Sequence, residues 1–209
     1  LVYLVQDHEP GFYALSSRYL MALSTYEYEG PMIAVFNTSL LSDYFSQQGY
    51  PFMERYAFEP ELHPMLARTL QQTKVMTKER RLVLYGRPGV ARNAFELVCQ
   101  GVREWSRLYP ESALWRIESL GEQHQDIDLH HGARIVCRGK LSLEEYAQTL
   151  SSAAVGVSLM LSPHPSYPPL EMAEFGVRVI TNSFENKDLG ARSSFIHSLH
   201  SVTPEKIAA

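Results

Sequence analysis

Cysteine is scarce in this sequence, with only two residues among 209. Cys99 falls in a helical pattern and Cys137 in a strand-like pattern, and neither belongs to a CxxC or Cys/His spacing of the kind that binds zinc. Reduced, buried thiols are the expected state of both residues. This use of cysteine is typical of a cytosolic protein.

The sequence also has no long hydrophobic run and no excess of positive charge. Its longest apolar run, residues 153–161, is far shorter than the roughly 20 residues that a membrane-spanning helix needs. The net charge is −4, and the one basic cluster, residues 78–81, includes a glutamate. We therefore expect no transmembrane segment and no nucleic-acid partner.

No secretory signal is present, and a cytoplasmic location is predicted, with the inner face of the membrane as an alternative. The first residue is Leu1 within a strand-like run, and the last residues, from Thr203, read as the start of a helix. We expect both ends to be cut, so targeting information is expected to be missing.

Several familiar catalytic and nucleotide-binding motifs are missing as well. The loop that follows the predicted strand 82–86 reads GRPGVARN, which lacks the later glycines of GxGxxG and the Gly-Lys-Ser/Thr of a P-loop. This argues against a dinucleotide cofactor. No Ser/His/Asp or Cys/His spacing supports covalent catalysis.

What the sequence does contain is an alternation of strands and helices from Leu82 onward. Helical periodicity covers about residues 92–108, and Ser142 with Glu145 forms a capping box for a later helix. The predicted strands are 82–86, 114–119, 133–138, 155–161, 177–181 and, more weakly, 198–202. The pattern predicts an α/β fold, with a Rossmann-like parallel sheet that carries helices on both faces.

The first 50 residues read as part of a second α/β domain. Strands are expected at 1–5 and 32–36, with helices around 18–28 and 38–48. We predict three regions: residues 1–50 as a remnant of one domain, 51–80 as a linker and 81–209 as a nucleotide-binding domain.

The stretch from Ser158 to Thr181 is the most informative part of the chain. It reads as a buried strand, a proline-rich loop, a helix opened by Pro168 and Pro169, and a further strand. Glu171 is expected in the first turn of that helix, where its carboxylate could accept hydrogen bonds from the two hydroxyls of a ribose. Gly176 is expected to end the helix in a left-handed conformation.

Three cations lie near the carboxyl ends of predicted strands, where open α/β sheets bind ligands. Arg87 and Arg92 flank the turn after strand 82–86, and Lys140 follows strand 133–138. Guanidinium groups match phosphate oxygens, so these residues are candidates for binding a diphosphate. Solvated surface positions remain the alternative for all three.

Two polar loops contain residue types that could take part in chemistry. The loop HQDIDLHHG (residues 124–132) could be read as a metal site, but it lacks a helical ligand pair, and an exposed turn is favoured. Asp7, His8 and Glu9 follow the first strand, where a Rossmann-like half-domain places its working groups. A solvated loop is the alternative there.

The sequence resembles bacterial glycosyltransferases of the two-domain GT-B architecture, and more narrowly the WsaF type of rhamnosyltransferase. The resemblance covers most of the chain, and its strings occur in the same order. They are YLVQDHEPGFY (3–13), AVFNTSLLSDYF (34–45), YGRPGVARNAFEL (85–97), LGEQHQDIDL (120–129), GKLSLEEYA (139–147) and SPHPSYPPLEMAEFGVRVITNSFENKDL (162–189).

The resemblance implies a role for each matching residue. Glu171 would hold the donor ribose, Arg87 and Lys140 the diphosphate, and the loop of Asp7 would face the donor sugar from the acceptor-side domain. The wider retaining family carries a glutamate where this chain has Pro163. Contacts to the sugar are therefore expected from His164, Ser166 and Tyr167.

The resulting hypothesis is a glycosyltransferase that moves a deoxyhexose, rhamnose by resemblance, from a dTDP-linked donor to a glycan or lipid-linked glycan acceptor. UDP- and GDP-linked donors are alternatives, no further cofactor or metal is expected, and retention of configuration is implied. Asp7, Arg87 and Lys140 are the predicted catalytic residues, with Glu9 competing with Asp7. This chain alone is expected to be inactive. A nucleotide-sugar epimerase and a non-catalytic nucleotide-binding module are the rival functions.

Overall fold

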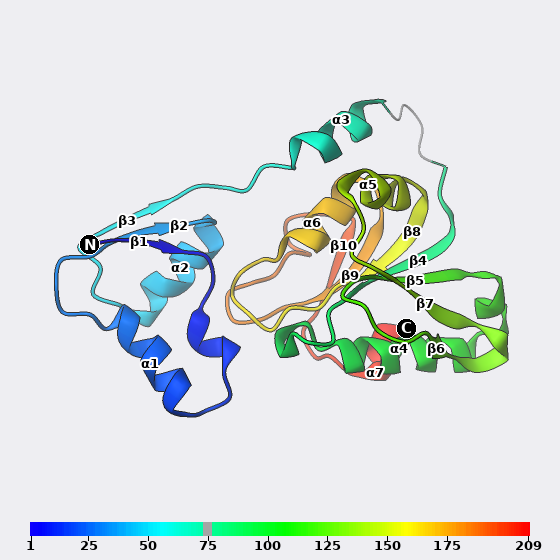
Figure 1. Cartoon of the computed structure of the whole chain (residues 1–209), viewed down its shortest axis with the longest axis horizontal. Helices are drawn as coiled ribbons and strands as arrows, with labels where there is room; N and C mark the ends of the chain where they lie inside the picture. Colours follow the sequence, from blue (N-terminus) through cyan, green and yellow to red (C-terminus); the bar gives the residue numbers. More distant parts are fainter. Residues whose placement is uncertain (73–76) are drawn as a thin grey trace. The chain divides into compact units, whose positions relative to one another are not determined.

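The computed structural model describes residues 1–72 and 77–209, which form two compact units (Figure 1). Unit 1 contains Leu1–Glu61 together with the two short segments Met160–Pro165 and Phe184–Lys187. Unit 2 contains Leu62–Leu159, Ser166–Ser183 and Asp188–Ala209. Each unit has its own sheet and its own hydrophobic core.

Unit 2 is built on a seven-stranded sheet with the order β10-β9-β8-β4-β5-β7-β6. All its strand pairs are parallel except β6–β7. The α/β prediction is therefore confirmed, and the short strand β6, which lies in the loop read as an exposed turn, is an addition to it. The strands are β4 (Glu79–Gly86), β5 (Arg116–Gly121), β6 (Ile127–Asp128), β7 (Arg134–Gly139), β8 (Ala153–Val157), β9 (Arg178–Asn182) and β10 (Ile196–Leu199).

Alternation along β4 divides the core of unit 2 into two layers. Leu82 and Leu84 face one side of the sheet and Val83 faces the other, because successive side chains of a strand point to opposite faces. Helices α4 (Phe95–Leu108) and α7 (Pro204–Ala208) cover the first side. Helices α3 (Pro64–Gln72), α5 (Leu143–Ser152) and α6 (Tyr167–Glu174) cover the second.

A glycine in α4 allows the close packing of α7. A Cβ atom at Gly101 would lie 2.4 Å from Cγ2 of Ile207, well inside normal contact distance. Glycine is thus required for this helix pair to approach as it does. The 3-10 turn η2 (Ala91–Asn93) precedes α4, so the helix expected from about Arg92 begins at Phe95.

Unit 1 contains a three-stranded parallel sheet in the order β1-β2-β3. Aromatic side chains dominate its core, where Tyr26, Phe36 and Phe45 are fully buried. Its elements are β1 (Val2–Val5), the 3-10 turn η1 (Glu9–Phe12), α1 (Ser17–Tyr26), β2 (Ile33–Phe36), α2 (Ser39–Gln48) and β3 (Glu54–Ala57).

The stretch expected to be a linker, residues 51–80, contains regular structure at both ends. Strand β3 extends the sheet of unit 1 by pairing with β2. Helix α3 buries Leu66 in the core of unit 2. Residues 73–76 of the expected linker lie outside the described residues.

The order of strands in unit 2 determines where a ligand site can form. The chain runs outward from β4 to β5 and β7, and then returns to β8 on the opposite side of β4 before continuing to β9 and β10. Open α/β sheets bind ligands beyond the carboxyl ends of the strands near such a reversal. None of the helices described in residues 1–72 and 77–209 has the length and hydropathy needed to span a bilayer.

Candidate functional site

A pocket of about 460 Å³ lies at the carboxyl ends of β4, β5 and β7 and beside the first turns of α5 and α6. It combines two cations and two carboxylates with aromatic and aliphatic walls. Its lining residues are Tyr85, Arg87, Leu120, Gly121, Glu122, Lys140, Leu141, Leu143, Tyr146, Tyr167, Pro168 and Glu171. A concave site with few convergent polar groups is the usual form of a small-molecule site.

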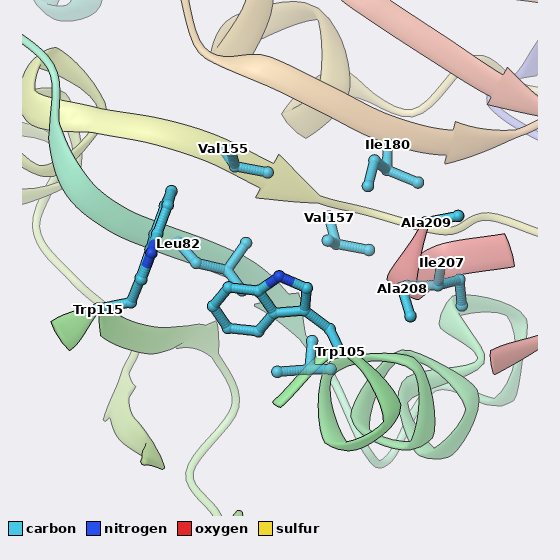
Figure 2. A pocket seen from close by; sticks show the side chains of 10 residues that line it. Leu82, Trp105, Trp115, Val155, Val157, Ile180, Ile207, Ala208 and Ala209 are labelled. Carbon is cyan, nitrogen blue, oxygen red and sulfur yellow. The ribbon is translucent and has the colours of Figure 1, made fainter. Parts of the chain in front are cut away.

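A second pocket of about 260 Å³ has a different character (Figure 2). It lies between the sheet and helices α4 and α7, and Trp105 and Trp115 meet edge to face there, with ring centroids 5.6 Å apart. No charged side chain lines it; the walls are Leu82, Val102, Trp105, Trp115, Val155, Val157, Ile180, Ile207, Ala208 and Ala209. It therefore offers no cationic side chain to a diphosphate, and the larger pocket is the candidate site.

Glycines bring the ends of β4 and β5 together in the larger pocket. Gly121 has a φ of +135°, and a Cβ atom there would lie 2.5 Å from the carbonyl oxygen of Gly86. The next residue, Glu122, donates its backbone N–H to that same carbonyl at 2.8 Å. This contact places the side chain of Glu122 beside the loop that carries Arg87.

The carboxylate of Glu122 accepts two hydrogen bonds from that loop. Arg87 Nε donates to Oε1 at 3.2 Å, and the backbone N–H of Gly89 donates to Oε2 at 2.8 Å. The ion pair is open to solvent, since the side chains are 39% and 35% exposed. Such pairs contribute about 0.2–1 kcal/mol to stability, so other partners can readily replace this one.

Lys140 occupies the turn between β7 and α5. Gly139 before it has a φ of +60°, and Ser142 after it caps α5 in the predicted capping box with Glu145. The Lys140 side chain is exposed, and it has no ion-pair partner among the described residues. Its charge is therefore available to a ligand in the pocket.

Glu171 lies on the inner wall of the pocket and is held by Tyr146 from α5. The Tyr146 hydroxyl donates to Glu171 Oε2 at 3.1 Å. Burial raises the pKa of the Glu171 carboxyl, while this hydrogen bond and His63 act in the opposite direction. The expected position in the first turn of α6 is wrong, because the helix begins at Tyr167 and Glu171 falls one residue beyond that turn.

The helix that carries Glu171 is otherwise formed as its sequence predicts. Pro168 and Pro169 lie near the start of α6, where their missing N–H groups cost no hydrogen bond. Gly176 follows the helix with a φ of +71°, which confirms the left-handed stop.

Unit 1 contains a second polar cluster at the carboxyl end of β1. Asp7 is buried, and its Oδ1 accepts hydrogen bonds from the Ser162 hydroxyl and from the His8 N–H, the latter at 2.8 Å. The Ser162 hydroxyl in turn accepts the His164 N–H at 3.1 Å. The His164 ring lies 3.2 Å from the side-chain amide of Asn37.

A fully buried lysine belongs to the same cluster. Lys187 Nζ donates to the carbonyl oxygen of Met160. Burial lowers the pKa of Lys187 to about 7, even though the Asp7 carboxylate favours its charged form. Glu9, the competitor of Asp7, lies apart from these contacts and accepts a hydrogen bond from the Tyr3 hydroxyl at 3.1 Å.

The family described as "WsaF, C-terminal domain" matches residues 80–209, and "WsaF, N-terminal domain" matches residues 1–39. The chain belongs to the WsaF family. The resemblance seen in the sequence is thereby confirmed.

A curated relative of this WsaF-family chain is the "O-antigen biosynthesis protein RfbC" of Myxococcus xanthus. The two are 32% identical over 192 residues, which cover 86% of this chain. The matched part is 14% of the relative, so the chain spans a small share of that protein's length.

The structure brings together some of the predicted site residues of the WsaF-family chain. Arg87, Lys140, Tyr167 and Glu171 line the pocket in unit 2. Arg92 and Ser166 belong to unit 2 but are not lining residues, and Asp7 and His164 belong to unit 1. The roles assigned to all eight residues remain predictions.

Glu122 and Tyr146 line the pocket but were missed in the sequence. Glu122 follows β5 as directly as Arg87 follows β4, so the same positional argument would have found it. Tyr146 lies on the first helical turn after the capping box, and its hydroxyl contacts Glu171, which is 25 positions later in the chain. No local sequence signal marks that contact.

In the loop of residues 124–132, polar side chains form hydrogen bonds and an ion pair within the fold. His124 Nε2 lies 2.8 Å from Ser119 Oγ, and Asp126 accepts the backbone N–H of Cys137 at 2.9 Å. Asp128 pairs with Arg134 at 2.6 Å. Among the residues described, no three His, Cys, Asp or Glu side chains are grouped as metal ligands.

Proposed function

We propose that this chain is part of a glycosyltransferase of polysaccharide biosynthesis and that the 460 Å³ pocket binds its nucleotide-sugar donor. The observation that carries the proposal is the pocket's arrangement: Arg87 and Lys140 lie at strand ends, and Glu171 lies in the same cavity. Membership of the WsaF family and the name of the Myxococcus relative support the same class of reaction.

The two cations would bind the diphosphate of the donor. Cleavage of the donor leaves negative charge on the nucleoside diphosphate, and fixed positive groups stabilise that charge as it develops. Arg87 supplies a planar guanidinium group with several N–H groups, and Lys140 supplies a mobile ammonium group. Together they can stay in contact with the diphosphate as it leaves the sugar. In this proposal, side chains supply the positive charge that neutralises the leaving group.

Glu171 would bind the ribose of the donor. An ionised carboxylate accepts hydrogen bonds only, and it is therefore suited to sugar hydroxyls. Tyr146 fills one acceptor position of the carboxylate and restrains it in the pocket that both residues line. A dTDP-linked donor, with a deoxyhexose such as rhamnose, is the specific form of the proposal, and retention of configuration is proposed with it.

The donor can be tested by calorimetric titration of the chain with dTDP, UDP, GDP and NAD. We expect dTDP or UDP to bind and NAD not to bind, because the chain lacks the GxGxxG turn of a dinucleotide site. Binding of NAD without binding of any nucleoside diphosphate would contradict the proposal. The variant Arg87→Ala tests whether binding occurs in this pocket, and it should weaken dTDP binding.

Asp7 is proposed to act on the acceptor in the full-length enzyme, as a base or by orienting the acceptor hydroxyl. Asp7→Asn keeps the shape of the side chain but removes its charge, so we expect unchanged donor binding and roughly a hundredfold slower transfer. Glu9→Gln is the matched comparison: normal transfer in Asp7→Asn with loss in Glu9→Gln would identify the other carboxylate.

EDTA in the same assay tests metal independence, and restoration of lost activity by magnesium would contradict it.

A further inference from the structure

Glu122 accepts hydrogen bonds from two groups of the kind that bind phosphate in proteins. One is the guanidinium Nε–H of Arg87, and the other is the backbone N–H of Gly89. Proteins commonly hold phosphate oxygens with this combination of an arginine and main-chain N–H groups in a glycine-containing turn. In the pocket, however, both donors are bound to a carboxylate of the protein itself.

The backbone holds Glu122 next to these donors. Its own N–H is bound to the carbonyl of Gly86, and Gly121 before it adopts a backbone conformation that only glycine takes readily. A Cβ atom at Gly89 would lie 2.8 Å from Glu122 Oε2, so glycine leaves room for the carboxylate beside this N–H.

The contact between Arg87 and Glu122 is also weak enough for a bound anion to replace Glu122. Both side chains of the Arg87–Glu122 pair are more than one-third exposed, so water screens their attraction. A diphosphate carries more charge than a carboxylate, and it can engage Lys140 of the same pocket, which has no ion-pair partner among the residues described.

We propose that Glu122 takes the place of the donor's diphosphate when no nucleotide is bound. It keeps Arg87 Nε and the Gly89 N–H in position for an anion, and it gives up both when a nucleoside diphosphate binds. Its negative charge then lies near the bound diphosphate and opposes binding. Glu122 thus lowers the affinity for the donor and for the released nucleotide, which favours product release. This inference rests on the proposed function of the pocket.

The test compares the wild type with Glu122→Gln by calorimetric titration with dTDP, inorganic pyrophosphate and thymidine. Glutamine has nearly the same shape but no charge, so both the ion pair with Arg87 and the repulsion of the diphosphate are removed. We expect dTDP and pyrophosphate to bind roughly three- to tenfold more tightly to the variant, with thymidine unaffected. Glu144→Gln, which removes an exposed charge from α5 outside the pocket lining, controls for the general effect of charge.

Three outcomes would overturn the inference. Unchanged dTDP affinity would mean that Glu122 does not compete with the ligand, and weaker binding would mean that Glu122 stays on Arg87 and positions it in the complex. Equal tightening in Glu144→Gln would also count against it. If Glu122→Gln folds poorly by circular dichroism, Glu122→Ala repeats the comparison.

The same titrations separate this inference from the proposed function. If no nucleoside diphosphate binds either protein, the proposed function fails, whereas tighter binding of pyrophosphate alone would still support the role of Glu122. If dTDP binds the wild type but no more tightly to the variant, the proposed function stands and the role of Glu122 is wrong. A double-mutant cycle adds a check, because Arg87→Ala should cost more affinity in the Glu122→Gln background than in the wild type.

Discussion

Among single residues, the Tyr146–Glu171 pair gives the sharpest prediction. Burial raises the pKa of the Glu171 carboxyl, and protonation removes its charge and turns one of its two acceptor oxygens into a donor, which weakens its hydrogen bonds to a ribose. The affinity for dTDP should therefore fall as the pH is lowered through that raised pKa. Tyr146→Phe removes a hydrogen bond that lowers the pKa, so the loss should begin at a higher pH in the variant.

Calorimetry with dTDP over a series of pH values measures both effects. Glu171→Ala is the limiting case and should weaken binding by about 1.5–3 kcal/mol, as expected for losing hydrogen bonds to a charged group. Its pH dependence in the same range should be lost. An unchanged affinity with a lower melting temperature would show that Glu171 serves only the fold.

The sequence predicts the position of a single residue best where that residue directly follows a strand. Arg87 and Lys140 were found because the carboxyl ends of parallel strands meet at one edge of a sheet, and both do line the pocket. Lys187 shows the limit of the method, since lysines are almost always exposed and this one is fully buried. Its contact with Met160 forms across 27 residues and leaves no local pattern.

At the scale of elements, Lys78 joins the ends of two helices. Its Nζ donates to the carbonyls of Leu150 and Ser151 at the end of α5, at 3.1 and 3.3 Å, and to that of Phe175 after α6, at 2.7 Å. The last carbonyls of a helix have no partner within the helix, and the negative end of its dipole attracts a cation. One side chain thus stabilises both elements.

We expect Lys78→Met to lower the free energy of unfolding by about 1.5–3 kcal/mol, because three carbonyls lose a charged donor. Methionine keeps the length of the side chain and therefore isolates the loss of the ammonium group. Lys206→Met is the control, since Lys206 is exposed and its side chain has no hydrogen bond in the described residues. Equal urea midpoints for the two variants would show that Lys78 contributes nothing beyond its charge.

Most elements were predictable because each has a local signal. The capping box at Ser142 and the glycine stop at Gly176 both occur as expected. Strand β3 and helix α3 were not recognised, since their stretch is rich in charge, proline and glutamine. β3 is stabilised by its pairing with β2 and α3 by the burial of Leu66, and such tertiary contacts override weak local preference.

For the whole molecule, the two tryptophans provide a direct measure of ligand binding. Trp105 and Trp115 are the only tryptophans of the chain, and both belong to unit 2 in the apolar pocket, outside the lining of the candidate site. Their fluorescence therefore reports the unfolding of unit 2. At a hundred times its dissociation constant, dTDP should raise the free energy of that transition by about 2.7 kcal/mol.

This prediction is checked by urea unfolding followed at the tryptophan emission, with and without dTDP. Arg87→Ala should show a smaller shift at the same dTDP concentration, while its midpoint without ligand stays close to that of the wild type. A tryptophan transition that does not respond to a nucleotide shown to bind by calorimetry would place the binding site outside unit 2.

The short strand β6 has a consequence for behaviour in concentrated solution. A parallel sheet that ended on β7 would expose a row of free backbone groups, and such edges recruit strands from other chains into aggregates. Here the two residues of β6 pair antiparallel with the first two residues of β7, and Asp128 of β6 forms an ion pair with Arg134. A strand this short, with charges on it, is a poor template for further pairing, so this edge of the sheet resists intermolecular association.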